Sequence, residues 1–162
     1  MHAKDRFHSR DLRAGRRSIA GQVYVITTTC MNRRPLFTDL VLASCASRSL
    51  TEQRLWRDSR LLAWVLMPDH WHGLVELGHG ENLSRVIGRA KAVSVAAVNR
   101  LRACRSPVWH AGFHDRAVRR EESLLAAARY LVANPIAAGL ANSPGEYPFW
   151  GSVWPGIEED PI

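Results

Sequence analysis

Apolar residues recur along this chain at two spacings, and each spacing predicts a different kind of element. Runs rich in β-branched and aromatic residues predict strands, whereas apolar residues three and four positions apart predict the buried face of a helix. From the N-terminus, the pattern predicts a strand at 21–30, a helix from 40 to about 57, strands at 61–67 and 70–77, a helix from 83 to about 103, a strand around 112–118, and a helix that begins at Glu121-Glu122 and ends at Asn134-Pro135.

The order of these elements predicts the fold class. Strand, helix, strand, strand, helix and strand in succession match the split βαβ pattern of ferredoxin-like domains. We therefore expect an α+β fold in which an antiparallel sheet carries helices on one face, with one further helix at the C-terminal end. Pro68 and Asp69 alone separate two of the strands, which predicts an antiparallel hairpin. Asp39 and Asn82 are predicted to cap the first two helices.

Composition indicates one globular domain with two polar ends. The chain has 162 residues, of which 46% are apolar, enough to bury a hydrophobic core. We assign residues 1–18 to a basic N-terminal arm, 19–152 to one domain, and 153–162 to an acidic tail. No apolar run approaches the length of about 20 residues that a membrane helix needs, and no signal-peptide core follows the N-terminus, so we expect a cytoplasmic protein.

The positions of the cysteines and the net charge limit the kinds of structure and partner that the sequence allows. Cys30, Cys45 and Cys104 are scattered, which matches neither a disulfide framework nor a zinc knuckle. The net charge of +7 and the pI near 10.1 favour a polyanionic partner such as nucleic acid. Candidate phosphate-binding residues lie on the predicted helix 83–103 and in the N-terminal arm: Arg85, Arg89, Lys91, Arg16 and Arg17. The alternative is that these side chains only form a solvated surface.

Two histidines flank a tryptophan at the start of the predicted strand 70–77. Residues i and i+2 of a strand point to the same face, so His70 and His72 project together and Trp71 projects to the other side. Adjacent neutral imidazoles are a natural pair of metal ligands. The alternative is a strand with two polar residues on its solvated face, and two ligands alone do not hold a metal tightly.

The last predicted helix offers further chemistry. Tyr130 and Asn134 lie four residues apart, so they share one helix face. The small residues Ala126, Ala127 and Ala133 leave space around them. If this helix packs beside the histidine strand, a hydroxyl nucleophile and an amide carbonyl converge on the histidine pair. The alternative is a partly buried tyrosine with its hydroxyl in water.

Several phrases together resemble one family, the REP-associated tyrosine transposases within the single-tyrosine HUH (IS200-like) transposases, where HUH denotes two histidines around a hydrophobic residue. The matching phrases, in order, are YVITTTCMNRRPLF, WVLMPDHWHGLVEL, VWHAGFHDRAVRREE, YLVANPIAAGL and EYPFWGS. The resemblance covers about residues 20–152. Two positions depart from the family pattern, because Asp69 stands where asparagine is common and Trp71 is an unusual residue between the histidines.

The resemblance implies an activity and a site. It makes Tyr130 the nucleophile, His70, His72 and Asn134 the ligands of Mg²⁺ or Mn²⁺, and the terminal helix catalytic. The implied reaction cuts and rejoins single-stranded DNA beside REP-like hairpins through a 5′-phosphotyrosine, in a monomer associated with the nucleoid. His114 and Asp115, on the neighbouring strand, are candidate helpers that would support the site without holding the metal, although a structural role is the simpler interpretation.

Two other functions remain open from the residues. The same fold can bind single-stranded nucleic acid without cutting it, and a metal-dependent hydrolase could use Tyr130 only to position water. The tryptophans and phenylalanines at 71, 109, 149 and 150 could stack on bases, but core packing is the simpler interpretation for most of them. The sequence specifies neither the DNA target nor whether the protein mobilises DNA.

Overall fold

An antiparallel sheet forms the centre of the computed structural model, which describes residues 17–158. Within this range the sheet has five strands in the order β4-β1-β3-β2-β5. Their bounds are β1 Val23–Thr29, β2 Arg60–Leu66, β3 His70–Glu76, β4 His114–Ala117 and β5 Trp150–Ser152. Each neighbouring pair is antiparallel, including the predicted β2–β3 hairpin. The predicted arm up to residue 16 and the last four residues of the predicted tail lie outside the described residues.

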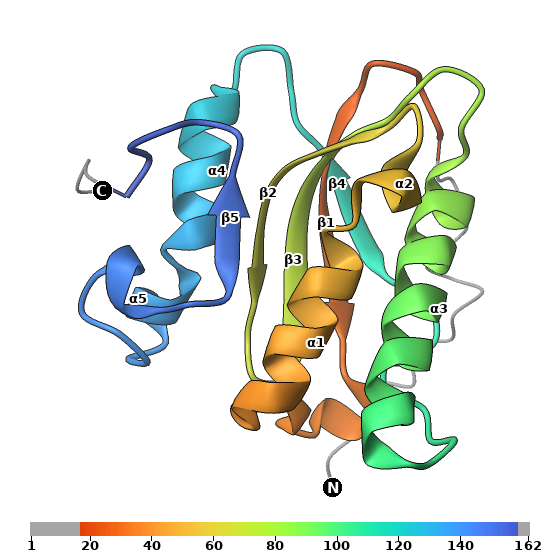
Figure 1. The fold of residues 1–162 in the computed structure, drawn as a ribbon. Helices are drawn as coiled ribbons and strands as arrows, with labels where there is room; N and C mark the ends of the chain where they lie inside the picture. Colours follow the sequence, from red (N-terminus) through yellow and green to blue (C-terminus); the bar gives the residue numbers. More distant parts are fainter. Residues whose placement is uncertain (1–16, 159–162) are drawn as a thin grey trace, which may run out of the picture.

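Helices cover both faces of the sheet, as Figure 1 shows. On one face lie α1 (Leu40–Leu50), α2 (Gln53–Trp56) and α3 (Leu83–Arg102). On the other lies α4 (Leu124–Val132), followed by the short α5 (Asn134–Ala137). The α+β fold class is confirmed, with its ferredoxin-like helices together on one face and the additional C-terminal helix on the opposite one.

Alternation along the strands divides the core into two clusters and orients the histidine strand. Ile26 and Trp71 are buried against α1, α2 and α3, whereas Leu74 packs on the side of α4. The Trp71 indole stacks on Trp56 with a ring-centroid separation of 6.4 Å. Gly73 makes room for this ring, because a Cβ there would collide with the indole. Trp71 therefore fixes which face of β3 packs against α1, α2 and α3, and the histidines point to the opposite face, on which α4 lies.

The helix capping predicted from the sequence is confirmed, but two helix boundaries differ. The Asp39 side chain accepts hydrogen bonds from the amides of Val41 and Leu42, and Asn82 accepts one from Arg85. The helix predicted to reach about residue 57 instead ends at Leu50 and is followed by the separate α2. The cause is tertiary, because the Trp56 indole turns inward and donates to the Leu50 carbonyl at 2.9 Å.

The C-terminal region also departs from expectation. The helix predicted to start at Glu121-Glu122 begins at Leu124, because Ser123 caps it by accepting from the Ala126 amide. Near the end of α3, Val98 is buried whereas Leu101 is 54% exposed, so Leu101 does not belong to the buried face of the helix. Strand β5 was not predicted. None of the described helices is long and apolar enough to cross a membrane.

Candidate active site

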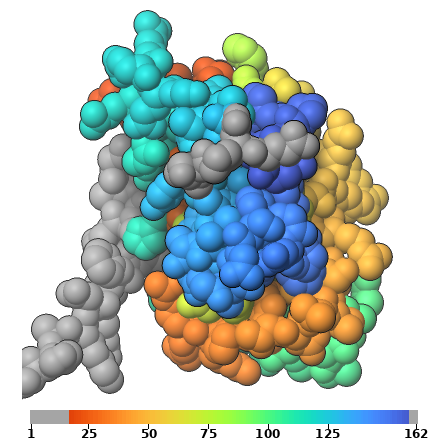
Figure 2. Space-filling model, turned by 90° about the vertical axis from the view of Figure 1, so that its left-hand side faces the viewer, coloured from red at the N-terminus to blue at the C-terminus, as the bar shows by residue number. Residues whose placement is uncertain are grey.

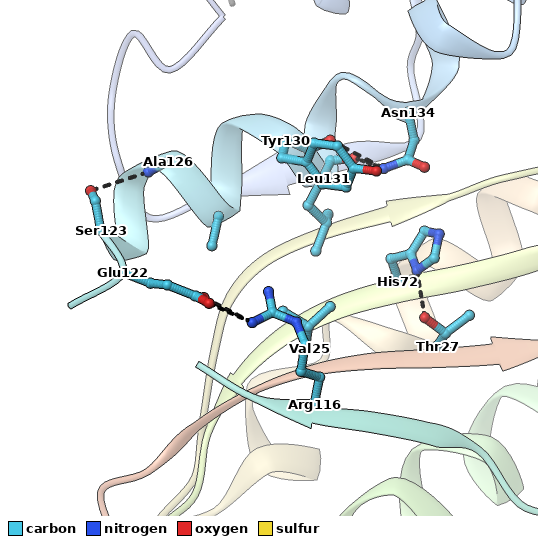
Figure 3. A pocket seen from close by; sticks show the side chains of 11 residues that line it. Val25, Thr27, His72, Arg116, Glu122, Ser123, Ala126, Tyr130, Leu131 and Asn134 are labelled. Carbon is cyan, nitrogen blue, oxygen red and sulfur yellow. Dashed lines mark hydrogen bonds and ion pairs between the residues drawn. The ribbon is translucent and has the colours of Figure 1, made fainter. Parts of the chain in front are cut away.

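A cavity of about 550 Å³ lies between α4 and the strands β1, β3 and β4. Figure 2 views the molecule from this side and shows the blue segment that contains α4 and α5 at the surface. The cavity brings together three of the predicted site residues, His72, Tyr130 and Asn134, and Figure 3 shows them facing one another. Its lining residues are Val25, Thr27, His72, Arg116, Glu122, Ser123, Ala126, Ala127, Tyr130, Leu131 and Asn134.

His70 and His72 form the pair that the alternation of β3 predicts. Their ring centroids are 4.7 Å apart. The Nδ1 atom of His72 lies 2.8 Å from the Thr27 hydroxyl oxygen, and the Nδ1 atom of His70 lies 2.6 Å from Asp69 Oδ1. Metal-binding histidines are commonly oriented in this way, with one ring N–H donated to an outer partner. Both rings are thus held through Nδ1, and Nε2 is the nitrogen left to coordinate a cation.

The electrostatics of His72 favour its neutral form. Burial lowers the pKa of His72 from 6.5 to about 4, and the neighbouring His70 contributes in the same direction. An imidazole must be deprotonated to bind a metal ion. At neutral pH, His72 therefore carries no proton that a cation would have to displace.

Tyr130 and Asn134 approach the histidines from the other wall of the cavity. Tyr130 is 76% exposed. The Asn134 amide nitrogen donates to the Leu131 carbonyl at 2.9 Å and to the Tyr130 carbonyl at 3.2 Å, so its oxygen is left as an acceptor. Asn134 begins α5 instead of continuing α4, yet it stays beside Tyr130. Tyr130 and Asn134 therefore line the same cavity as His72, on the histidine side of the sheet.

The donor set fits a divalent cation that also binds its substrate. Among the described residues, no group of three or more histidine, cysteine, aspartate or glutamate side chains could hold a metal ion. Two imidazole nitrogens and the Asn134 carbonyl oxygen would supply three neutral ligands. Such a set leaves coordination positions and positive charge for the oxygens of an anionic substrate. Because the site is open and mixes nitrogen with oxygen donors, it suits Mn²⁺ or Mg²⁺ with phosphate better than a closed structural zinc site.

The two predicted helper residues lie on different faces of β4. His114 pairs with Thr27, and Thr27 also pairs with His72 in the register of the sheet. Cross-strand partners share a face, so His114 lies on the cavity face, one strand beyond Thr27. Asp115 pairs with Ile26, whose side chain is buried on the opposite face. Of the two predicted helpers, only His114 lies on the same face as the site.

Sequence reasoning missed four polar residues of the cavity, Thr27, Arg116, Glu122 and Ser123. Thr27 orients His72, and Arg116 forms an ion pair with Glu122 in which Nη1 lies 2.8 and 2.9 Å from the two carboxylate oxygens. A signal for Thr27 existed, because Tyr24 and Ile26 alternate with it in an apolar strand. The register that pairs Arg116 with Val25 could not be found from the sequence pattern alone.

The basic residues predicted on α3 lie across the sheet from the cavity. Arg89 donates from Nε to the Leu55 carbonyl at 2.8 Å and forms an ion pair with Glu81 at 3.1 Å. Lys91 donates to the carbonyls of His110 and Gly112 at 2.7 and 2.6 Å, and burial lowers its pKa to about 8. Both side chains therefore hold the fold together.

The remaining predicted DNA-binding residues are Arg85, Arg17 and Arg16. Arg85 is exposed. Arg17 is also exposed, and its carbonyl accepts a hydrogen bond from the Tyr24 hydroxyl. Arg16 lies outside the described residues. DNA binding by all five basic residues stays a prediction. The aromatic residues Trp71, Trp109 and Phe149 are buried in the core, which confirms the packing interpretation for them.

Comparisons with known proteins agree with this geometry. The model of the family "Transposase IS200 like" matches residues 19–134. The fold resembles that of a REP-associated tyrosine transposase solved bound to a REP hairpin, with a TM-score of 0.64 and 21% identity over 83% of this chain and 79% of that one. It also resembles a candidate transposase from Deinococcus radiodurans R1, with a TM-score of 0.51 and 16% identity over 79% of this chain and 97% of that one. No curated protein matches the sequence significantly. Because the family match extends over most of the domain that carries the histidine strand and Tyr130, the chain belongs to the IS200-like transposase family, a family of DNA-processing enzymes.

Proposed function

We propose that this protein is a metal-dependent single-stranded DNA endonuclease and strand transferase that acts at hairpin-forming repetitive DNA through a 5′-phosphotyrosine intermediate. The observation that carries the proposal is the shared cavity, in which the exposed Tyr130 and the Asn134 amide face His72. A non-catalytic binding module has no need for this combination of side chains.

The three tyrosines of the chain differ in their availability for attack. The Tyr24 hydroxyl donates to the Arg17 carbonyl, and the Tyr147 hydroxyl donates to the Leu66 carbonyl. Tyr130 is mostly exposed and lines the cavity. A nucleophile that becomes attached to a DNA strand must stand at an open surface, because the strand has to enter the site and the fragment with the free 3′-OH has to leave it. Tyr130 meets this requirement, whereas the other two tyrosines are used in the fold.

The proposed reaction exchanges one phosphodiester for another. The Tyr130 oxygen bonds to the phosphorus of a DNA backbone phosphate, and the bond from phosphorus to the 3′ oxygen breaks. The phenol loses one proton and the departing 3′ oxygen gains one, so no net charge is created. The product is a 5′-phosphotyrosine with a free 3′-OH, and a later attack by a 3′-OH reverses the step and joins strands. No nucleotide cofactor is needed, because the ester energy is conserved in the link to tyrosine.

The chain's own residues would prepare this step. His70, His72 and Asn134 would hold the cation, with Asp69 and Thr27 fixing the two rings. A bound Mg²⁺ or Mn²⁺ would align the phosphate and neutralise the charge that develops on it. His114, on the same face of the sheet, is the better placed of the two predicted helpers.

Hairpin DNA is the proposed substrate for three reasons. A tyrosine attack on a backbone phosphate needs an unpaired strand in the cavity, and a hairpin with a single-stranded flank supplies one. The solved REP-associated tyrosine transposase that this fold resembles was bound to a REP hairpin. The net charge of +7 suits a phosphate backbone. We propose that the protein acts on this DNA as a monomer.

The test is an adduct assay with end-labelled DNA. Hairpin oligonucleotides from the host genome, with single-stranded flanks, are incubated with protein and Mn²⁺ and separated on a denaturing gel. We expect oligonucleotides labelled at the 3′ end to shift covalently with the protein, and those labelled at the 5′ end to give a shorter free fragment. Tyr130→Phe should abolish both products and keep hairpin binding, whereas the matched control Tyr147→Phe should retain both.

Each alternative function gives a different gel. Cleavage without a covalent shift would refute the tyrosine mechanism and favour a hydrolase. Hairpin binding by the wild type without any cleavage, in the presence of Mn²⁺ and across the hairpin set, would favour the non-catalytic binding module.

A further inference from the structure

One end of the cavity is not used by the proposed reaction. Its lining beyond Tyr130 consists of an apolar surface that ends in a charged pair and Ser123. The apolar residues are Val25, Ala126, Ala127 and Leu131. The charged pair is Arg116 and Glu122, whose side chains are 57% and 37% exposed. Figure 3 shows this pair at one end of the cavity and His72 at the other, with the Leu131 and Val25 side chains in between.

The distance between the two ends corresponds to roughly one nucleotide. Arg116 pairs with Val25, and His72 pairs with Thr27 on the other side of β1. Arg116 and His72 are therefore separated by two residues along the strand direction and by two strand spacings across the sheet. This separation places their Cα atoms roughly 12 Å apart. On α4, Ala126 lies about one helical turn, or 6 Å, before Tyr130. A base attached to the sugar next to the attacked phosphate would therefore reach the charged pair.

The chemistry of this end fits a base better than a second phosphate. A phosphate that reached Arg116 would have to displace the Glu122 carboxylate, which carries the same sign of charge and already accepts two contacts from Nη1. A base edge presents acceptors and donors side by side, so it can use both members of the pair without separating them. The apolar side chains between the two ends can pack against the face of a base, whereas they offer nothing to a phosphate.

We propose that this end of the cavity binds the unpaired base of a nucleotide adjacent to the attacked phosphate, with Arg116 and Glu122 reading its edge. Guanine fits the pair best. Arginine donates to its O6 and N7 acceptors, the commonest specific contact to a base, while the carboxylate accepts from its N1–H and amino group. In a single strand these edges are free for readout. The inference rests on the proposed function, because the adjacent nucleotide is defined by the attack of Tyr130.

The experiment varies one base at a time. Once the cleavage position is mapped, oligonucleotides carrying each of the four bases immediately 5′ or 3′ of that position are compared for the rate of adduct formation. For the wild type we expect guanine at one of these positions to be preferred by between about 5-fold and 100-fold, the range for one bidentate pair. Arg116→Ala and Glu122→Gln should reduce the preference to about 2-fold or less. Arg48→Ala, an exposed arginine on α1, should leave it unchanged.

The test compares the ratio of adduct-formation rates between substrates for each protein. This ratio does not depend on the folded fraction of a variant, because partial unfolding lowers the rates for all four substrates equally. A wild type that forms adducts without any base preference overturns the inference and leaves the proposed function intact. An Arg116→Ala variant that slows all four substrates by the same factor also overturns it, since Arg116 would then contact the backbone.

A second experiment measures DNA binding and tests the inference even if no adduct forms. The Tyr130→Phe protein is titrated with a set of short single-stranded oligonucleotides that differ at one base, and guanine should again bind more tightly only when Arg116 and Glu122 are intact. If that preference is found and the wild type forms no adduct, the base-binding site stands and the proposed reaction fails. The absence of a preference in both arms overturns the inference.

Discussion

Replacing Asp69 with asparagine should weaken divalent metal binding by about tenfold. Asp69 Oδ1 lies 2.6 Å from His70 Nδ1, and both side chains are mostly shielded, with 29% and 19% of their surfaces exposed. When His70 coordinates a cation, its ring becomes more positive and its N–H a stronger donor. A hydrogen bond to a charged group contributes about 1.5–3 kcal/mol, whereas a neutral one contributes about 0.5–1.5 kcal/mol.

The expected magnitudes follow from that difference. Asp69→Asn keeps an acceptor but loses the charge, so it should cost about 1–1.5 kcal/mol of binding free energy, which is about tenfold in Kd. Asp69→Ala removes the acceptor as well and should approach 100-fold, the upper range for an outer partner of a metal-binding histidine. Arg33→Ala should change Kd by less than about threefold, because its contact to Asp69 is 3.5 Å long and solvent-exposed, and such pairs contribute little.

Calorimetric titration of the metal-free protein with Mn²⁺ measures these values directly, without DNA or catalysis. His72→Ala defines the signal that remains when a ligand is lost, and circular dichroism confirms that each variant is folded. If Asp69→Asn binds Mn²⁺ within twofold of the wild type, the carboxylate does not support the site and the reasoning is refuted. If the wild type itself does not bind Mn²⁺, the proposed metal site fails altogether.

Three further predictions concern stability, measured by urea unfolding. The pKa of His72 falls from 6.5 in the unfolded chain to about 4 in the fold, so its contribution is complete above pH 6.5 and is lost as the pH falls towards 4. At 1.36 kcal/mol per pH unit this amounts to about 3 kcal/mol, and His72→Gln should lack this part of the pH dependence. Ser123→Ala removes the cap of α4 and should cost about 1 kcal/mol, and a loss below 0.3 kcal/mol would contradict the capping role. Arg89→Ala strands the Leu55 carbonyl and the Glu81 carboxylate and should cost about 1–3 kcal/mol, whereas the exposed Arg85→Ala should stay within about 0.5 kcal/mol. Equal losses for the two arginines would contradict this assignment.

Much of the fold could be predicted because its signals are local. The β2–β3 hairpin follows from two apolar runs around Pro68-Asp69, and the cap of α3 follows from Asn82 before an apolar period. The errors have non-local causes. The helix predicted to continue through residue 57 breaks because the Trp56 indole donates a hydrogen bond to the Leu50 carbonyl and stacks on the Trp71 ring. The helix predicted to begin at Glu121 starts later, where Ser123 caps it, and Glu122 instead pairs with Arg116 on β4.

In the candidate site, too, the features within one element could be predicted, whereas those that depend on packing between elements could not. His70 and His72 share a face by strand alternation, and Tyr130 and Asn134 share one by helical spacing, so each pair could be predicted from its own element. That the two pairs meet across one cavity depends on α4 packing against β2 and β3, and the sequence indicated this only through its resemblance to a family. Alternation along β1 predicts the face on which Thr27 lies, but its pairing with His72 and the position of Arg116 depend on strand register, which a single sequence does not specify.

Charge alone does not tell which basic residues stabilise the fold and which are available to bind substrate. Arg89 and Lys91 looked equivalent to any other cation on a DNA-binding helix, but their donors are already engaged with carbonyls or a carboxylate of the protein. Arg116 drew no notice, although it stands in the cavity with Tyr130. A side chain that stabilises the fold would lose its partners on contacting DNA, whereas one paired only across an exposed cavity can exchange its partner for substrate at little cost. Arg116, which lines the cavity together with the exposed Tyr130, is therefore a stronger candidate for contact with substrate than Arg89 or Lys91.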